Sequence, residues 1–115
     1  MQNDLVVTIT ESNFESLVIQ ATLPVLVDFW APWCGPCRML EPVISQIASQ
    51  VQGRAVIGKV DVDKNPGVAG RFHIQAVPQI FFFQKGEVRD RSVGYVSKAA
   101  LLSKLEAIIL ATGPP

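Results

Sequence analysis

Short apolar runs alternate along the chain with segments whose apolar residues recur at helical spacing. The runs are rich in β-branched residues and predict strands at 5–9, 25–30, 55–62, 79–83 and 88–93. The helical spacing predicts helices at about 14–21, from the cysteine pair to about 51, at 66–72 and after Ser97. The order of elements is therefore β-α-β-α-β-α-β-β-α.

Local signals mark where these helices begin and end. Residues 12–15 have the pattern of a capping box, and Asn65–Pro66 is typical of an N-cap followed by proline in the first turn. Pro42 falls inside the second helix and should kink it, because proline removes one backbone hydrogen bond. The tail at 112–115 is expected to be frayed.

This order of elements predicts an α/β fold. Strands joined through helices favour parallel pairing, whereas the last two strands, joined by the short turn at 84–87, must be antiparallel. We therefore expect a mixed sheet with helices on both faces, formed by residues 1–115 as a single domain. Functional sites of such sheets lie where a strand's carboxyl end meets the next helix, and residues 30–34 occupy that junction.

Composition and charge exclude several classes of protein. The chain has 115 residues, is 49% hydrophobic and has a formal net charge of zero, which argues against disorder and against nucleic acid as the main partner. No apolar run approaches the ~20 residues of a membrane helix, because Asp28 interrupts the best candidate. Residues 1–4 lack the positive charge of a signal peptide, so we expect a cytoplasmic protein with no membrane contact.

The two cysteines, Cys34 and Cys37, are separated only by Gly-Pro. A bond that closes so small a loop restricts the unfolded chain little, so redox chemistry explains the pair better than structural stapling. At a helix start, residues three apart share one face with β-carbons about 5–6 Å apart, close to disulfide geometry. The free N–H groups there favour a thiolate, so we expect a lowered pKa at Cys34 and a less exposed Cys37 as the resolving thiol.

Three other interpretations of the pair are open. A zinc site needs four ligands, and the chain adds only one histidine and scattered carboxylates, so we expect no metal. A Cys–His hydrolase needs His73 beside Cys34, and its mechanism gives the second cysteine no role. The third is an inert structural pair. Dithiol–disulfide exchange uses both sulfurs and is the function that we favour.

Residues 25–37, with the sequence VLVDFWAPWCGPC, resemble the thioredoxin family. Further matches at 61–67, Val77–Pro78, 86–88 and Gly94 extend the resemblance over nearly the whole chain. It implies the thioredoxin fold, in which a central mixed sheet of five strands in the order 1-3-2-4-5 is flanked by four helices. It also implies a general protein-disulfide reductase that maintains the redox homeostasis of the cell.

By the mechanism that the resemblance implies, the Cys34 thiolate attacks a target disulfide, and Cys37 then releases the reduced target. This leaves a Cys34–Cys37 disulfide. A flavoprotein thioredoxin reductase would restore the dithiol with electrons from NADPH, and the chain itself would bind no cofactor. Its partners would be that reductase and disulfide-containing proteins, and the chain would act as a monomer.

Asp28 and Lys59 each interrupt an apolar strand. Because burying an unpaired carboxylate is costly, Asp28 fits either a sheet edge or salt bridge, or a functional site. The resemblance implies an Asp28 buried beneath the cysteines, with a pKa raised by desolvation, that accepts or relays the proton of Cys37. Lys59 either pairs with Asp28 and tunes it or extends to solvent.

The resemblance also implies a cis peptide between Val77 and Pro78, held against the cysteine pair, where the Val77 backbone pairs with an extended substrate segment. The substrate surface that it implies comprises Trp33, Gly35, Pro36, Val77, Pro78 and Gly94. Two residues depart from the family pattern. Gln79 stands where threonine is usual, and Arg38 where lysine is common.

Two other functions remain open. One is a domain that donates disulfides, as protein disulfide isomerases do, although those proteins typically carry Gly-His between the cysteines. The other is a structural subunit that uses the same surface without turnover. Trp30 is expected to pack beneath the site, residues 81–83 to fill the core on both faces of the sheet, and His73 to face water.

Overall fold

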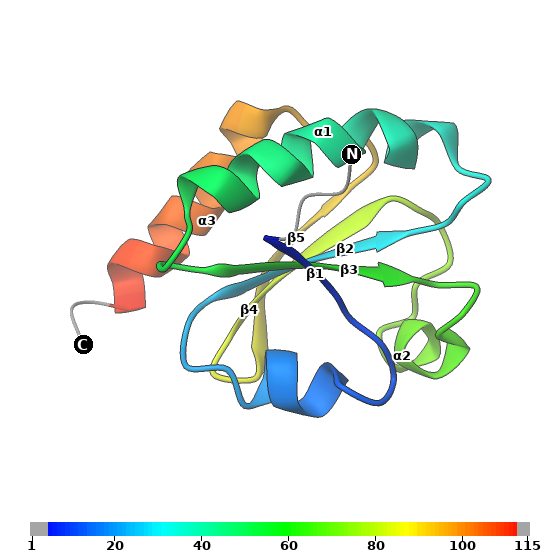
Figure 1. Ribbon diagram of the computed structural model, residues 1–115, viewed down its shortest axis with the longest axis horizontal. Helices are drawn as coiled ribbons and strands as arrows, with labels where there is room; N and C mark the ends of the chain where they lie inside the picture. Colours follow the sequence, from blue (N-terminus) through cyan, green and yellow to red (C-terminus); the bar gives the residue numbers. More distant parts are fainter. Residues whose placement is uncertain (1–4, 113–115) are drawn as a thin grey trace.

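The computed structural model describes residues 5–112, which are organised around a five-stranded sheet in the order β1-β3-β2-β4-β5 (Figure 1). The strands are β1 (Val6–Thr8), β2 (Val25–Trp30), β3 (Val56–Asp61), β4 (Gln79–Gln84) and β5 (Glu87–Val93). The helices of this described part are the π-helix η1 (Glu15–Ile19), α1 (Gly35–Gln50), α2 (Pro66–Arg71) and α3 (Lys98–Thr112). The predicted fold class, strand order and set of flanking helices are confirmed.

The sheet is mixed, with β1, β3 and β2 parallel to one another and β4 antiparallel to both β2 and β5. The expectation that helix-linked strands are parallel is wrong for β4. Asp61 ends β3 beside Trp30, and Gln79 begins β4 beside Phe29, so the chain leaves and re-enters the sheet at the same end. The short α2 does not carry the chain across the sheet, and β4 must therefore run back along β2.

The turn between β4 and β5 is confirmed as a hairpin. Its two central residues, Lys85 and Gly86, have φ values of 51° and 78°. Two consecutive residues with positive φ are typical of a type I′ turn, whose twist matches that of the paired strands.

The capping box expected at 12–15 is wrong in its position. The Asn13 side chain accepts a hydrogen bond from the Thr10 amide at 2.7 Å, and the Thr10 carbonyl accepts one from the Phe14 amide at 2.9 Å. The capping contact therefore lies two residues earlier than expected. It joins the Asn13 side chain to the Thr10 amide, whereas the expected box would join the Glu15 side chain to the Ser12 amide. Ser12 instead lies 2.9 Å, hydroxyl to hydroxyl, from Thr10.

Two hydrophobic clusters cover opposite faces of the sheet. On one face α1 and α3 pack against Leu26, Ile57 and Phe82, and on the other η1 and α2 lie against a cluster that includes Phe81 and Phe83. Figure 1 shows the two pairs of helices on either side of the strands. The prediction that residues 81–83 fill the core on both faces is confirmed.

The helix boundaries bear on two further predictions. α1 continues through Pro42, and a kink there stays a prediction. Thr112 is still helical, so the expected fraying does not begin with it, and the rest of that tail lies outside the described residues. No helix among residues 5–112 is both long and apolar enough to cross a membrane.

Candidate active site

Cys34 and Cys37 lie where β2 gives way to α1, and they are joined by a disulfide with a Cα–Cα distance of 5.3 Å. Cys34 is the N-cap of α1, with extended backbone angles of −93° and 111°, and its sulfur accepts a hydrogen bond from the Cys37 amide at 3.2 Å. Pro36 occupies the first turn, where a missing N–H costs no intrahelical bond. The Cys37 amide at the helix start therefore points at Cys34 Sγ, and the helix dipole favours negative charge there.

The two cysteines are almost equally buried, with exposures of 4% for Cys34 and 3% for Cys37. The expected contrast between an outer and an inner sulfur is therefore nearly absent in this oxidised state. The reason is that Cys34, Cys37 and Ala31 pack as one small cluster against the half-buried Trp30 and Val77.

The loop before β4 closes over the disulfide. The Val77–Pro78 peptide is cis, as predicted, and the Val77 carbonyl oxygen lies 3.7 Å from Cys34 Sγ. The Gly94 amide donates a hydrogen bond to the Pro78 carbonyl at 2.9 Å, and Gly94 has a φ of 82°, which suits glycine. Residues from three distant parts of the sequence thus meet at one end of the sheet.

Asp28 lies in β2, between β3 and β4 and away from either sheet edge, with 4% of its surface exposed. Its Oδ1 has no hydrogen-bond partner among residues 5–112. Burial raises the pKa of Asp28 from 3.8 to about 7, Lys59 opposes this rise, and Glu41 adds to it. Asp28 is therefore a carboxyl group able to take up or release a proton near neutral pH.

Lys59 is the register partner of Asp28 on β3, but the two side chains form no ion pair in the part of the chain described. Lys59 Nζ instead lies 5.3 Å from the centroid of the Trp30 ring. The interpretation of direct pairing is thus wrong, because the lysine extends over the indole. Its charge still acts on Asp28 through space and lowers the pKa of Asp28.

Trp33 extends from the junction into solvent, with 70% of its surface exposed. Its indole N–H donates a hydrogen bond to Asp63 Oδ2 at 2.9 Å. Sequence reasoning missed Asp63, although its place two residues beyond the end of β3, at the edge where β2 also ends, was a usable signal.

The other residues expected at the substrate surface differ in how exposed they are. Gly35 and Pro36 are exposed and flank the disulfide. Val77 and Gly94 are half-buried, and Pro78 is buried.

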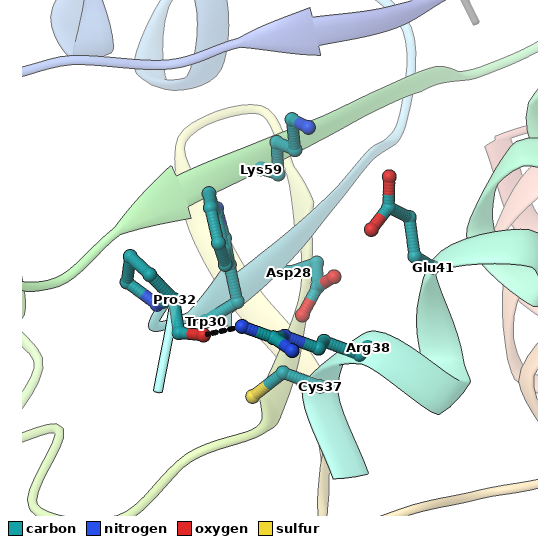
Figure 2. A pocket seen from close by; sticks show the side chains of 7 residues that line it. All are labelled: Asp28, Trp30, Pro32, Cys37, Arg38, Glu41 and Lys59. Atoms are coloured by element: carbon teal, nitrogen blue, oxygen red, sulfur yellow. Dashed lines mark hydrogen bonds between the residues drawn. The ribbon is translucent and has the colours of Figure 1, made fainter. Parts of the chain in front are cut away.

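A cavity of about 290 Å³ lies on the α1 side of the sheet, between Cys37 and Lys59 (Figure 2). It is lined by Asp28, Trp30, Pro32, Cys37, Arg38, Glu41 and Lys59. The Arg38 guanidinium donates a hydrogen bond to the Pro32 carbonyl at 2.9 Å, drawn in Figure 2. Sequence reasoning did not place Glu41 at the site, because only the packing of α1 on the sheet brings it there.

The competing interpretations of the cysteine pair find no supporting geometry. Among residues 5–112, no three His, Cys, Asp or Glu side chains come together as a metal site. His73 is exposed just after α2 with a φ of 56°, and no hydrogen bond joins it to either cysteine within the described chain.

Comparisons with known proteins agree with this geometry. The family model described as Thioredoxin matches residues 5–107. Thioredoxin 1 of a Nostoc species is 46% identical over 98 residues, which cover 85% of this chain and 92% of the relative. A thioredoxin of Rickettsia felis is 42% identical, covering 82% of this chain and 90% of that protein. A chloroplastic M-type thioredoxin of pea, Pisum sativum, is 43% identical, covering 88% of this chain and 59% of the plant protein.

Proposed function

Because this chain belongs to the thioredoxin family, we propose that its Cys34–Cys37 pair reduces disulfides in target proteins and so maintains redox homeostasis. The chain is a disulfide oxidoreductase. The observation that carries the proposal is the disulfide at the start of α1, where the Cys37 amide donates a hydrogen bond to Cys34 Sγ and the Val77 carbonyl oxygen lies 3.7 Å from the same sulfur.

Reduction begins when the Cys34 thiolate attacks one sulfur of a target disulfide. The target's S–S bond breaks, a Cys34–target bond forms, and the other target sulfur leaves as a thiolate that takes a proton from water. The helix-start amide that bonds Cys34 Sγ in the oxidised form would stabilise the attacking thiolate in the same way.

Cys37 completes the exchange. Its sulfur attacks Cys34, the Cys34–target bond breaks, and the Cys34–Cys37 bond forms while the target leaves with the electron pair. The thiol proton of Cys37 passes to Asp28, whose pKa of about 7 makes it a proton acceptor matched to neutral pH. Lys59 tunes that acceptor, because its positive charge favours the ionised form of Asp28.

Target binding is assigned to the surface around Cys34. The exposed Trp33 offers an apolar contact, and its bond to Asp63 fixes the ring beside the disulfide. The Val77 backbone would pair with an extended target segment. The proposed binding residues are Trp33, Gly35, Pro36, Val77, Pro78 and Gly94.

The remaining assignments concern the partners of the protein. We propose that a thioredoxin reductase regenerates the dithiol with electrons from NADPH, that no cofactor binds the chain itself, and that the protein acts as a monomer on disulfide-containing proteins. A reductase of this kind needs a compartment that keeps thiols reduced, and we propose the cytoplasm.

We also propose that residues 1–115 form one domain. Both hydrophobic clusters pack against strands of the same sheet, so neither half of the chain has a core of its own.

The test is insulin reduction, coupled to NADPH through a thioredoxin reductase, with wild type and Cys37→Ser compared. We expect turnover by wild type and none by the variant, which retains the nucleophile but not the resolving thiol. Normal turnover by Cys37→Ser would exclude the two-thiol mechanism, and absence of turnover in wild type would favour a structural role.

A further inference from the structure

The cavity beside Cys37 holds a carboxylate that the proposed exchange does not use. Glu41 lies four residues, about one turn, after Cys37, so α1 presents both on the same side. Figure 2 shows the Glu41 side chain extending from α1 along the side of the cavity opposite the Trp30 ring, with Asp28 between them. An exposed helix residue is thereby brought to the edge of a buried proton site.

Neither cation of the cavity neutralises this carboxylate. The Arg38 guanidinium is turned to the Pro32 carbonyl, at 2.9 Å, and Lys59 Nζ lies over the Trp30 ring at 5.3 Å. Within residues 5–112, Glu41 itself takes part in no ion pair or side-chain hydrogen bond. Its negative charge therefore acts on the cavity without a local counter-charge.

We propose that Glu41 is a positioning residue for disulfide exchange, which places a second negative charge beside the Asp28 carboxyl in the cavity and so acts on its proton transfer. This inference rests on the proposed function, in which Asp28 receives the proton of Cys37. Glu41 touches neither sulfur and acts only through Asp28.

The charges around Asp28 support this role. Burial contributes most to its raised pKa, Lys59 on β3 opposes the rise, and Glu41 on α1 reinforces it. Arg38 is the remaining charged group of the cavity, and β4 places the apolar Ile80 opposite Asp28. Glu41 thus offsets part of the effect of Lys59 on a carboxyl whose pKa is raised mainly by burial.

The experiment compares wild type with Glu41→Gln, Glu41→Asp and Glu87→Gln. Glu41→Gln removes the charge at nearly constant shape, Glu41→Asp retains it, and Glu87→Gln removes a charge from the exposed start of β5 as a matched control. The titration of the Asp28 carboxyl is followed by carbon NMR in the oxidised protein, and insulin reduction is measured from pH 5 to 9.

We expect Glu41→Gln to lower the Asp28 midpoint by roughly half a pH unit, because an exposed charge acts weakly across a cavity open to solvent. The acid limb of the rate profile should move by the same amount, while Glu41→Asp and Glu87→Gln stay at the wild-type position.

An unchanged Asp28 midpoint in Glu41→Gln overturns the inference, even if wild type reduces insulin normally. A shifted midpoint with an unshifted acid limb also overturns it, since Glu41 would then have no effect on exchange. The NMR titration requires no turnover, so a failure of wild type to reduce insulin would count against the proposed function and be distinguishable from either result.

Discussion

Replacing Asp28 by asparagine should stabilise the protein above neutral pH and leave it unchanged or weaker in acid. The carboxyl is buried in the middle of the sheet, and that burial raises its pKa from 3.8 to about 7 against the opposing effect of Lys59. The folded state therefore binds a proton between these two pH values that the unfolded state has already released. Asparagine keeps the shape of the side chain and removes the titration.

Whether stability rises or falls with pH depends on which state, folded or unfolded, holds the proton. A group whose pKa is higher in the folded state contributes most to stability below pH 4 and loses this contribution as the pH rises through 7. At about 1.4 kcal/mol per unit, the shift corresponds to about 4 kcal/mol in full, of which roughly 2.5 kcal/mol is lost between pH 5 and pH 8.

The assay is guanidinium denaturation of the oxidised protein at pH 5, 6, 7 and 8. We expect the difference in unfolding free energy between Asp28→Asn and wild type to grow in favour of the variant by about 2.5 kcal/mol across this range. A difference that stays constant within 0.5 kcal/mol would refute the reasoning, because a normally titrating Asp28 is fully ionised throughout it.

Asp90→Asn is the control for this experiment. Slight burial raises the pKa of Asp90, but hydrogen bonds from the Arg91 amide and from Lys104 outweigh it and lower the pKa overall. The stability that Asp90 contributes is thus fully present above its usual pKa of 3.8 and is lost only as the pH falls below that value. Asp90→Asn should therefore show no pH-dependent difference from wild type between pH 5 and pH 8.

Three further outcomes are expected. Cys37→Ser should halt at the mixed disulfide, seen as a covalent adduct with the target on a non-reducing gel; release of the target at the wild-type rate would contradict this. In denaturant unfolding, Gly58→Ala should lower the free energy of unfolding by about 1–3 kcal/mol, because its methyl group would collide with the Ile9 side chain. The control Gly70→Ala, where a methyl group meets open space, should not lower it. Trp33→Ala should raise KM for insulin and change the unfolding free energy by less than about 0.5 kcal/mol, since the ring is mostly exposed; an unchanged KM would remove it from the binding surface.

The central features of the site were predictable because their signals are local. Cys34 and Cys37 lie in one turn at a helix start, and Asp28 stands out as a charged residue in an apolar strand. The cis peptide before Pro78 was predictable only from the family resemblance, since nothing in the residues alone favours that isomer strongly.

The features that sequence reasoning missed depend on distant segments. The hydrogen bond from Trp33 to Asp63 joins residues thirty positions apart, and Glu41 comes to line the same cavity as Asp28 only through the packing of α1 on the sheet. Lys59 was correctly placed near Asp28, but its position over the Trp30 ring depends on the shape of the cavity.

The sequence by itself determined the class of the fold, the elements and the reacting sulfurs, because hydrophobic period, turn residues and cysteine spacing act over a few neighbouring residues. Only the tertiary structure decided that β4 turns back along β2, that both cysteines are almost equally buried, and that Lys59 and Glu41 line the same cavity as Asp28. Burial and the distances between charges depend on how separate segments pack, and the pKa of a buried carboxyl depends on both.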